Sequence, residues 1–316
     1  MDSLVYSLNA TLPVFFVMVA GYIFRRMGIL SEEFVKSADK FNFKVTLPLL
    51  LFTDLATNNI KDIFDGRYAL FCAAVTTLMF FGTWIGAKIF IRDKSITGAF
   101  VQASYRSSVA ILGLAFITNI YDSPGMAPIM LIGSVPLYNI YAVLVLTFES
   151  SSSDSSLGEH IKKSIINIIK NPIIIGIVLG LLVGLSGIKL PHLISKPLTS
   201  IGAIASPLTL IAIGAGFEGK KALKKIKPTI AASIIKLIVI PAVFLYTSIK
   251  FGWRNQELVA LIIMLGSPTT PSCYIMAKNM NNDYVLTSSV VVATTLLSSV
   301  TLTFWIFICR YLGYIV

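Results

Sequence analysis

Long apolar runs recur along the whole 316-residue chain and are separated by short polar segments. A helix needs roughly 20 apolar residues to cross the hydrocarbon core of a bilayer. Ten runs approach this length, although the second is short and contains Pro48. We therefore expect an all-α membrane protein with ten transmembrane helices. The expected spans are residues 4–25, 42–57, 68–91, 97–119, 127–148, 164–186, 198–217, 229–251, 257–277 and 285–312.

The composition excludes a soluble or a disordered chain. Charged residues make up 13% of the sequence, about half of their usual share in soluble domains, and 55% of the residues are hydrophobic. A soluble fold of this size could not cover so much apolar side chain. The three cysteines lie in apolar runs without metal-like spacing, so we interpret them as packing residues. They are Cys72, Cys273 and Cys309.

The basic residues predict the orientation in the membrane. The net charge is +11, and the loops after odd-numbered spans hold 15 Lys and Arg, against 7 in the other loops and the C-terminus. Cytoplasmic loops carry the excess of positive charge, so both termini are expected outside. No basic run is interleaved with aromatic residues, and we expect no nucleic-acid partner. The expected location is a plasma membrane, of the bacterial inner-membrane type, with the lipid bilayer as a partner.

The two halves of the chain align at a fixed offset of 159 residues. Each half holds five spans, and an odd number turns the second copy over in the membrane. The expected units are a five-helix repeat at 1–148, a serine-rich cytoplasmic linker at 149–163 and an inverted repeat at 164–316, in one integrated membrane domain. Inverted repeats are typical of transporters; the alternative is a chance match between common Gly and Pro residues. The matches pair Pro13 with Pro172, Gly21 with Gly180, Gly28-Ile29 with Gly187-Ile188 and Pro48-Leu49 with Pro207-Leu208.

The fourth and ninth spans carry polar segments at equivalent places. In the ninth span Pro268 and Pro271 remove two backbone donors, so a continuous helix is not expected there. Such breaks are tolerated at membrane depth only around a cavity. The fourth span lacks proline, and a polar seam that only improves helix packing remains the alternative for both. The candidate binding residues are Ser104, Tyr105, Arg106, Ser107 and Ser108, and Ser267, Pro268, Thr269, Thr270, Pro271 and Ser272.

Two cations are expected inside the membrane, Arg106 and Lys236. An ionisable residue at this depth costs at least roughly 2.5–3.5 kcal/mol and usually has a partner or a role. No carboxylate is placed to neutralise them unless Asp54 reaches across, and such a site suits an anion. Arg can bind a carboxylate through two parallel hydrogen bonds. For Lys236, the alternative is that its long side chain reaches the membrane surface.

Asn42 and Asn139 are further polar residues within spans. We include Asn139 among the candidate binding residues, and Asn42, Asp54 and Lys236 among candidates for coupling or charge. The alternative for both Asn residues is an interhelical hydrogen bond. No phosphate-binding loop is encoded, the two histidines are in loops, and no metal-binding motif occurs. We expect no catalytic residues, no metal and no cofactor, with H+ or Na+ left open as a coupling ion.

The chain resembles the auxin efflux carrier family, which includes plant auxin exporters and bacterial malate or malonate permeases and is distantly related to the bile acid:sodium symporters. The resemblance extends over nearly the whole chain. It implies two inverted five-helix repeats, broken helices four and nine that cross near the substrate, and a scaffold of spans one, two, six and seven. It also implies that Ser107, Ser108 and Pro268 to Pro271 lie where the family binds its carboxylate. The residues that carry it are Phe41-Asn42, Leu47-Pro48-Leu49-Leu50, Asn171-Pro172, Pro207-Leu208 and Ala277-Lys278.

The chain departs from the plant members at the crossover, where Ser107, Ser108 and Ala115 stand near the positions of their Asn and Pro. No Asp stands near residues 71–74, and the central loop has only about fifteen residues. These departures favour a small bacterial-type organic anion, malate-like or malonate-like, over an auxin-like one.

We therefore expect a secondary transporter for a small organic anion, working by an elevator or rocking movement and not an enzyme. The alternatives are a cation/proton antiporter of the same fold and a membrane sensor that binds a ligand without moving it. A homodimer remains open.

Overall fold

The computed structural model describes residues 2–57, 65–109, 117, 125–149, 165–188 and 190–315. The described residues form helices joined by turns and short extended segments, and no strand occurs among them. Five helices are long and apolar enough to cross a membrane, which confirms the expected all-α membrane class. They are Gly66–Phe90, Ala127–Phe148, His192–Ala215, Ile226–Lys250 and Tyr284–Tyr311.

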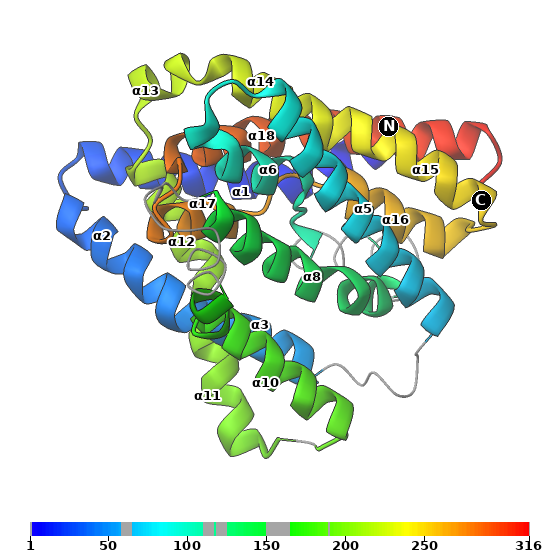
Figure 1. Cartoon of the computed structure of the whole chain (residues 1–316), viewed down its shortest axis with the longest axis horizontal. Helices are drawn as coiled ribbons and strands as arrows, with labels where there is room; N and C mark the ends of the chain where they lie inside the picture. The colour runs from blue at the N-terminus through cyan, green and yellow to red at the C-terminus, as the bar shows by residue number, and fades with distance from the viewer. Residues whose placement is uncertain are drawn as a thin grey trace.

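Helices of the first half match the expected first, second, third and fifth spans to within two residues at each end, and Figure 1 shows their arrangement. The second span contains a π-helix, Asn42–Thr46, that leads directly into α3. Of the fourth span, the structure describes α6, residues 106–109 and residue 117. The elements are α1 (Asp2–Arg26), α2 (Glu32–Phe41), α3 (Leu47–Thr57), α5 (Gly66–Phe90), the 3-10 helix Lys94–Ile96, α6 (Thr97–Tyr105) and α8 (Ala127–Phe148).

The second half contains two interruptions that bear on the site. A π-helix, Ile235–Val239, connects α14 to α15, and the ninth span is divided into α16 and α17. The elements are α10 (Pro172–Ser186), α11 (His192–Ala203), α12 (Ala205–Ala215), α13 (Gly219–Lys224), α14 (Ile226–Ile234), α15 (Ile240–Lys250), α16 (Asn255–Gly266), α17 (Ser272–Asn279) and α18 (Tyr284–Tyr311).

The expected sixth span is interrupted near its start, because residues 165–169 are helical and a turn at residue 170 precedes α10. Helix α10 starts at Pro172, because the Asn171 side chain caps it by accepting a hydrogen bond from the Ile173 amide at 2.9 Å. Proline at the first helical position needs no donor, so the pair forms a helix start. The expected linker at 149–163 lies outside the described residues, apart from Glu149.

Helices α3, α10 and α11 form one lobe, seen at the bottom of Figure 1. Helices α10 and α3 approach closely: a Cβ added at Gly176 would lie 2.5 Å from the Pro48 carbonyl oxygen. Helix α1 packs in the same way on α12, where Gly21 faces the Ile211 carbonyl. The short side chains let the backbones meet, as in other membrane helix pairs.

The other helices surround a buried centre formed by the two interrupted helices. Every residue of α6 is buried, as is α16 from Leu258 to Gly266. Helices α5, α8, α14 and α18 all pack against α6. The centre of the molecule is therefore the place where the helices are broken, not where they are continuous.

Candidate functional site

The helices of the fourth and ninth spans are interrupted at facing positions. Helix α6 ends at Tyr105, and Arg106 has extended backbone angles. Helix α16 ends at Gly266, and α17 begins at Ser272 after a non-helical segment. Pro268 and Pro271 explain the second interruption, as the sequence predicts, while the first occurs without any proline.

The two non-helical segments cross and are hydrogen-bonded to each other. The Ser108 amide donates to the Pro268 carbonyl oxygen at 2.9 Å. The Thr269 hydroxyl donates to the Ala103 carbonyl at 2.7 Å, and the side-chain amide of Gln102 donates to the Cys273 carbonyl at 2.9 Å. Backbone groups freed by the breaks thus find partners across the crossing, as buried polar groups require.

Arg106 occupies the C-terminal cap position of α6 and is only 2% exposed. Its guanidinium donates to the Asn139 side-chain oxygen at 2.8 Å, to the Ser272 hydroxyl at 3.0 Å and to the Met276 sulfur at 2.9 Å. In the described part of the chain these partners are all uncharged, and Nε is buried without a partner. Uncharged polar groups therefore hold the guanidinium in place. No carboxylate among the described residues is bonded to it to neutralise its charge.

Lys236 is fully buried within the π-helix that joins α14 to α15. Its ammonium donates to the Leu265 carbonyl at 2.5 Å and to the Ser107 hydroxyl at 2.6 Å. The alternative that this side chain reaches the membrane surface is wrong, because α6 and α16 enclose it. π-helical segments occur frequently at functional sites.

Both buried cations lie at C-terminal helix ends. Arg106 caps α6, and Lys236 binds the last turn of α16 through the Leu265 carbonyl. A helix C-terminus carries partial negative charge, so each cation offsets one negative helix end. The start of α17 at Ser272 has the opposite polarity, and no acidic residue lies in its first turn. Because each side chain carries a full charge and a helix end only about half of one, we infer a net positive charge for the crossing.

A small cavity of about 70 Å³ lies between this crossing and the lobe of α3. Asp54 of α3 and Thr209 of α12 line one side, while Arg106 and Ser272 line the other. Asp54 thus faces the cavity from α3, and Arg106 faces the same cavity from the crossing. The cavity residues are Leu47, Leu50, Leu51, Asp54, Arg106, Ser107, Ser108, Val109, Val135, Tyr138, Asn139, Ser206, Thr209, Thr270, Pro271 and Ser272.

Several candidates from the sequence do not reach the cavity. Ser104 donates to its own helix, and Tyr105 donates to the Tyr138 carbonyl. Asn42 donates to the Ala205 carbonyl and the Thr209 hydroxyl, which joins the second span to α12. Ser267, Pro268 and Thr269 lie behind the cavity wall, where the last two hold the crossing together.

Three polar residues of the cavity wall were missed by the sequence reasoning: Tyr138, Ser206 and Thr209. The Tyr138 hydroxyl donates to the Met264 carbonyl at 3.2 Å, beside the hydrogen bond from Ser107 to the same oxygen. Nothing in the sequence around Tyr138, which lies on α8, distinguishes it from a packing residue. Ser206 precedes Pro207 and Thr209 lies two residues after it, and this position near the repeated proline could have indicated them.

Comparisons with known proteins place the whole chain among membrane transporters. Residues 6–306 match the family described as membrane transport protein. The chain is 25% identical to the Uncharacterized transporter YfdV of Escherichia coli K12, over 97% of this chain and 99% of that protein. It is 22% identical to the Uncharacterized transporter MJ1031 of Methanocaldococcus jannaschii, over 94% and 97% of the two chains. An uncharacterized transporter of Methanothermobacter thermautotrophicus is 21% identical over 95% and 97%.

Proposed function

Because this chain belongs to the membrane transport protein family, the family of the auxin efflux carriers, we propose that it is a secondary transporter for a small organic carboxylate. The chemical class follows from the charge at the crossing. Arg106 lines the cavity with its guanidinium held by three uncharged acceptors. That guanidinium is the single observation that carries the proposal, because a buried Arg fork matches a carboxylate.

The start of α17 supports the same polarity. The Thr270 and Ser272 hydroxyls lie 3.2 Å apart on the cavity wall, and Ser272 begins the helix. The partial positive charge of a helix N-terminus favours anions, while the Cys273 and Tyr274 amides of this first turn already donate to the Thr270 and Pro271 carbonyls. A carboxylate in the cavity would replace the Ser272 hydroxyl as an acceptor for Arg106 and would add acceptors for the neighbouring hydroxyls.

The small size of the cavity favours a moving-domain mechanism. The cavity volume of about 70 Å³ is far below the roughly 300–1,000 Å³ of ligand pockets. A dicarboxylate needs more space, so α3 and α12 have to separate from the crossing for it to enter. We propose that the crossing, with its surrounding helices, moves as one body against a scaffold of spans one, two, six and seven, as an elevator or by rocking.

Ten spans in two inverted repeats are part of this proposal. The pairing of α1 with α12 and of α10 with α3 supports it, because the 159-residue offset relates one pair to the other. Gly28 and Gly187 support it further, since both equivalent glycines follow a helix with positive φ, +77° and +73°. The proposed location is a plasma membrane, with both termini outside.

The coupling ion is proposed from Asp54, the one acidic residue among the described residues that line the cavity. Asp54 lies on the α3 side of the cavity, and Arg106 lies on the side of the crossing. A proton carried by this carboxylate would change the net charge of the cavity by one unit during the transport cycle. Coupling to H+ is therefore the form of secondary transport that this cavity supports best.

A stability screen followed by a flux assay tests the proposed function. Purified protein is heated with malonate, malate or indole-3-acetate, each with and without sodium, and the same anions are then offered to proteoliposomes. We expect at least one anion both to raise the unfolding temperature and to accumulate by counterflow. Stabilisation without flux would show a sensor instead, and neither effect with any carboxylate would refute the proposal.

A further inference from the structure

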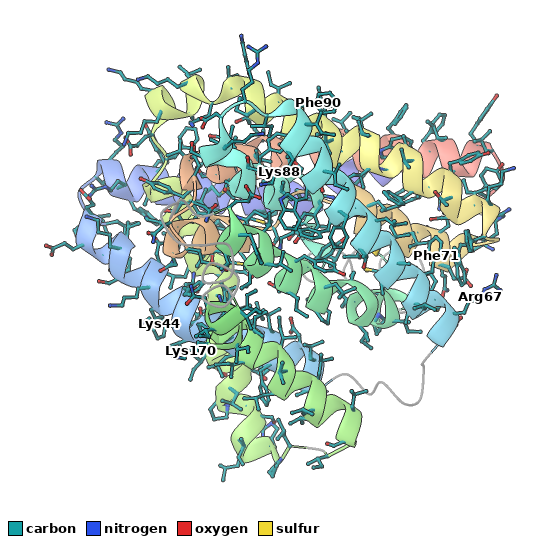
Figure 2. The ribbon with its side chains drawn as sticks, viewed as in Figure 1. Lys44, Arg67, Phe71, Lys88, Phe90 and Lys170 are labelled. Carbon is teal, nitrogen blue, oxygen red and sulfur yellow. The ribbon has the colours of Figure 1, made fainter. Side chains whose placement is uncertain are left out.

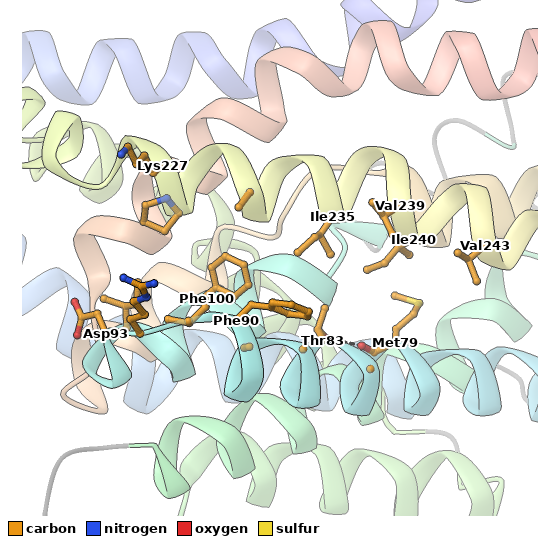
Figure 3. Close-up of a pocket in the computed structure, with 18 of the residues that line it drawn as sticks. Met79, Thr83, Phe90, Asp93, Phe100, Lys227, Ile235, Val239, Ile240 and Val243 are labelled. Carbon is orange, nitrogen blue, oxygen red and sulfur yellow. Dashed lines mark hydrogen bonds between the residues drawn. The ribbon is translucent and has the colours of Figure 1, made fainter.

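A deep apolar groove runs between α5 and the continuous helix made of α14, the π-helix and α15. It encloses about 880 Å³ and lies away from the crossing. Figure 3 shows the two helices as its long walls, with Lys227 near one end and Val243 near the other. Met79, Phe100 and Ile240 are among the apolar residues that line it, and nearly all of its wall is of this kind.

Aromatic contacts connect the start of α5 to the segment that follows α15. Near the start of α5, Tyr68 and Phe71 pack on Trp253 with ring centroids 4.9 and 5.7 Å apart. Arg67 there donates to the Phe251 carbonyl at 3.3 Å. Figure 2 shows Arg67 and Phe71 near this end of α5 and Phe90 near the opposite end. From residue 74 to residue 90, no hydrogen bond or ring contact between described residues joins α5 to α14 or α15.

Small residues keep the groove open. A Cβ added at Gly82 or at Gly86 would meet nothing within 4 Å, and Ala231 lines the opposite wall. Leu78 and Phe90 lie at the edge of the groove and are 61% and 83% exposed. An apolar volume of this size that opens sideways from two membrane helices excludes water. Acyl chains are the apolar material that surrounds such helices.

The end of the groove near Phe90 is basic. Arg92 and Lys227 line it, and neither has a hydrogen-bond or ion-pair partner among the described residues. Asp93 lies there too, but its carboxylate accepts hydrogen bonds from the Ser95 amide and hydroxyl at 3.1 and 2.6 Å and lies 3.9 Å from the Lys225 ammonium. Two cations therefore remain available at the mouth. The charge distribution of the loops predicts this side to be cytoplasmic, where anionic lipids are concentrated.

The length of the groove matches one leaflet. Leu78 and Phe90 are separated by about 18 Å along α5 at 1.5 Å per residue, and half of the hydrocarbon core is about 15 Å thick. We propose that this groove binds an anionic phospholipid of the cytoplasmic leaflet, with an acyl chain between α5 and α15 and the phosphate between Arg92 and Lys227. The lipid would complete the packing that the two helices lack.

Native mass spectrometry of the purified full chain tests the site without any transported substrate. The protein is mixed with dioleoyl phosphatidylglycerol or with dioleoyl phosphatidylcholine, and the bound lipid is counted. We expect phosphatidylglycerol to bind more tightly. The double variant Arg92→Gln/Lys227→Gln should lose about 25-fold of that preference, at about fivefold per basic residue near the membrane surface.

Two further variants locate the effect. Arg26→Gln/Lys40→Gln removes two exposed basic residues on the same predicted side of the membrane, outside the groove, and should leave the preference unchanged. Gly86→Phe fills the groove and should weaken both lipids. The proposal is overturned if the unaltered chain binds both lipids equally, or if the Arg92/Lys227 variant retains its preference. It is also overturned if the Arg26→Gln/Lys40→Gln variant loses as much of the preference for phosphatidylglycerol as the Arg92→Gln/Lys227→Gln variant does. All of these results concern lipid binding alone and stand apart from those of the flux assay.

Discussion

Lys278 at the end of α17 donates a hydrogen bond from Nζ to Oδ2 of Asp39, which lies on α2. The same ammonium donates to the Tyr274 hydroxyl at 2.8 Å and lies 5.3 Å from the ring centroid of Tyr284. The Asp39 side chain is 3% exposed. Because α2 leads into α3 and α17 belongs to the crossing, this ion pair connects the two sides of the cavity.

Replacing Lys278 with Met should destabilise the protein by about 3 kcal/mol, because it leaves a buried carboxylate without its cation. The double variant Asp39→Asn/Lys278→Met should recover most of that loss. The measurement is thermal unfolding of the purified protein in detergent. Lys36→Met breaks an exposed ion pair with Glu32 and should cost less than about 1 kcal/mol. Equal losses in the single and double variants would contradict this reading of the pair.

Replacing Arg106 with Ala should reduce malonate uptake by about 10- to 150-fold, since a hydrogen bond to a charged group contributes about 1.5–3 kcal/mol. Arg106→Lys keeps the charge but loses the planar fork, so we expect an intermediate rate. Uptake into proteoliposomes measures both, with unfolding temperatures recorded to show that the variants are folded. Uptake by a folded Arg106→Ala variant at the original rate would remove Arg106 from the site.

The sequence predicts most of the helices and the more prominent of the two breaks, because hydropathy and proline act locally. Pro268 and Pro271 indicate the break in the ninth span directly, whereas the break after Tyr105 depends on contacts with residues about 160 positions away, such as Pro268. The same reason hides the Asp39–Lys278 pair. Each residue looks like a loop charge next to a span, and only the packing of α2 on α17 brings them together. Lys236 was identified as buried or surface-reaching, and its enclosure by α6 and α16 decides between the two.

Malonate uptake by the unaltered protein should proceed at the same rate in sodium and in choline buffer. Half-helix C-terminal ends and unwound carbonyls are the groups that coordinate Na+ in related architectures. Here the Lys236 ammonium already binds the Leu265 carbonyl and the Ser107 hydroxyl. Uptake rates in the two buffers check the prediction, and a requirement for sodium would contradict it.

Lys236→Met removes the same ammonium while keeping a similar side-chain length. It should lower the unfolding temperature, because two charge-assisted hydrogen bonds at a buried helix end are lost. Lys250→Met, at the exposed end of α15, is the matched control and should change the unfolding temperature little. If both substitutions had the same small effect, Lys236 would not stabilise the end of α16.

Two glycine substitutions separate close helix packing from helix propensity. Gly176→Ala should destabilise the protein by about 1–3 kcal/mol, the usual cost of overpacking, because the added Cβ would lie 2.5 Å from the Pro48 carbonyl oxygen. Gly86→Ala adds the same methyl group where nothing lies within 4 Å, and it should be neutral or stabilising by up to about 1 kcal/mol. Unfolding temperatures in the same detergent compare the two directly. If Gly176→Ala were as stable as Gly86→Ala, α10 and α3 could not be in the tight contact on which a rigid scaffold depends.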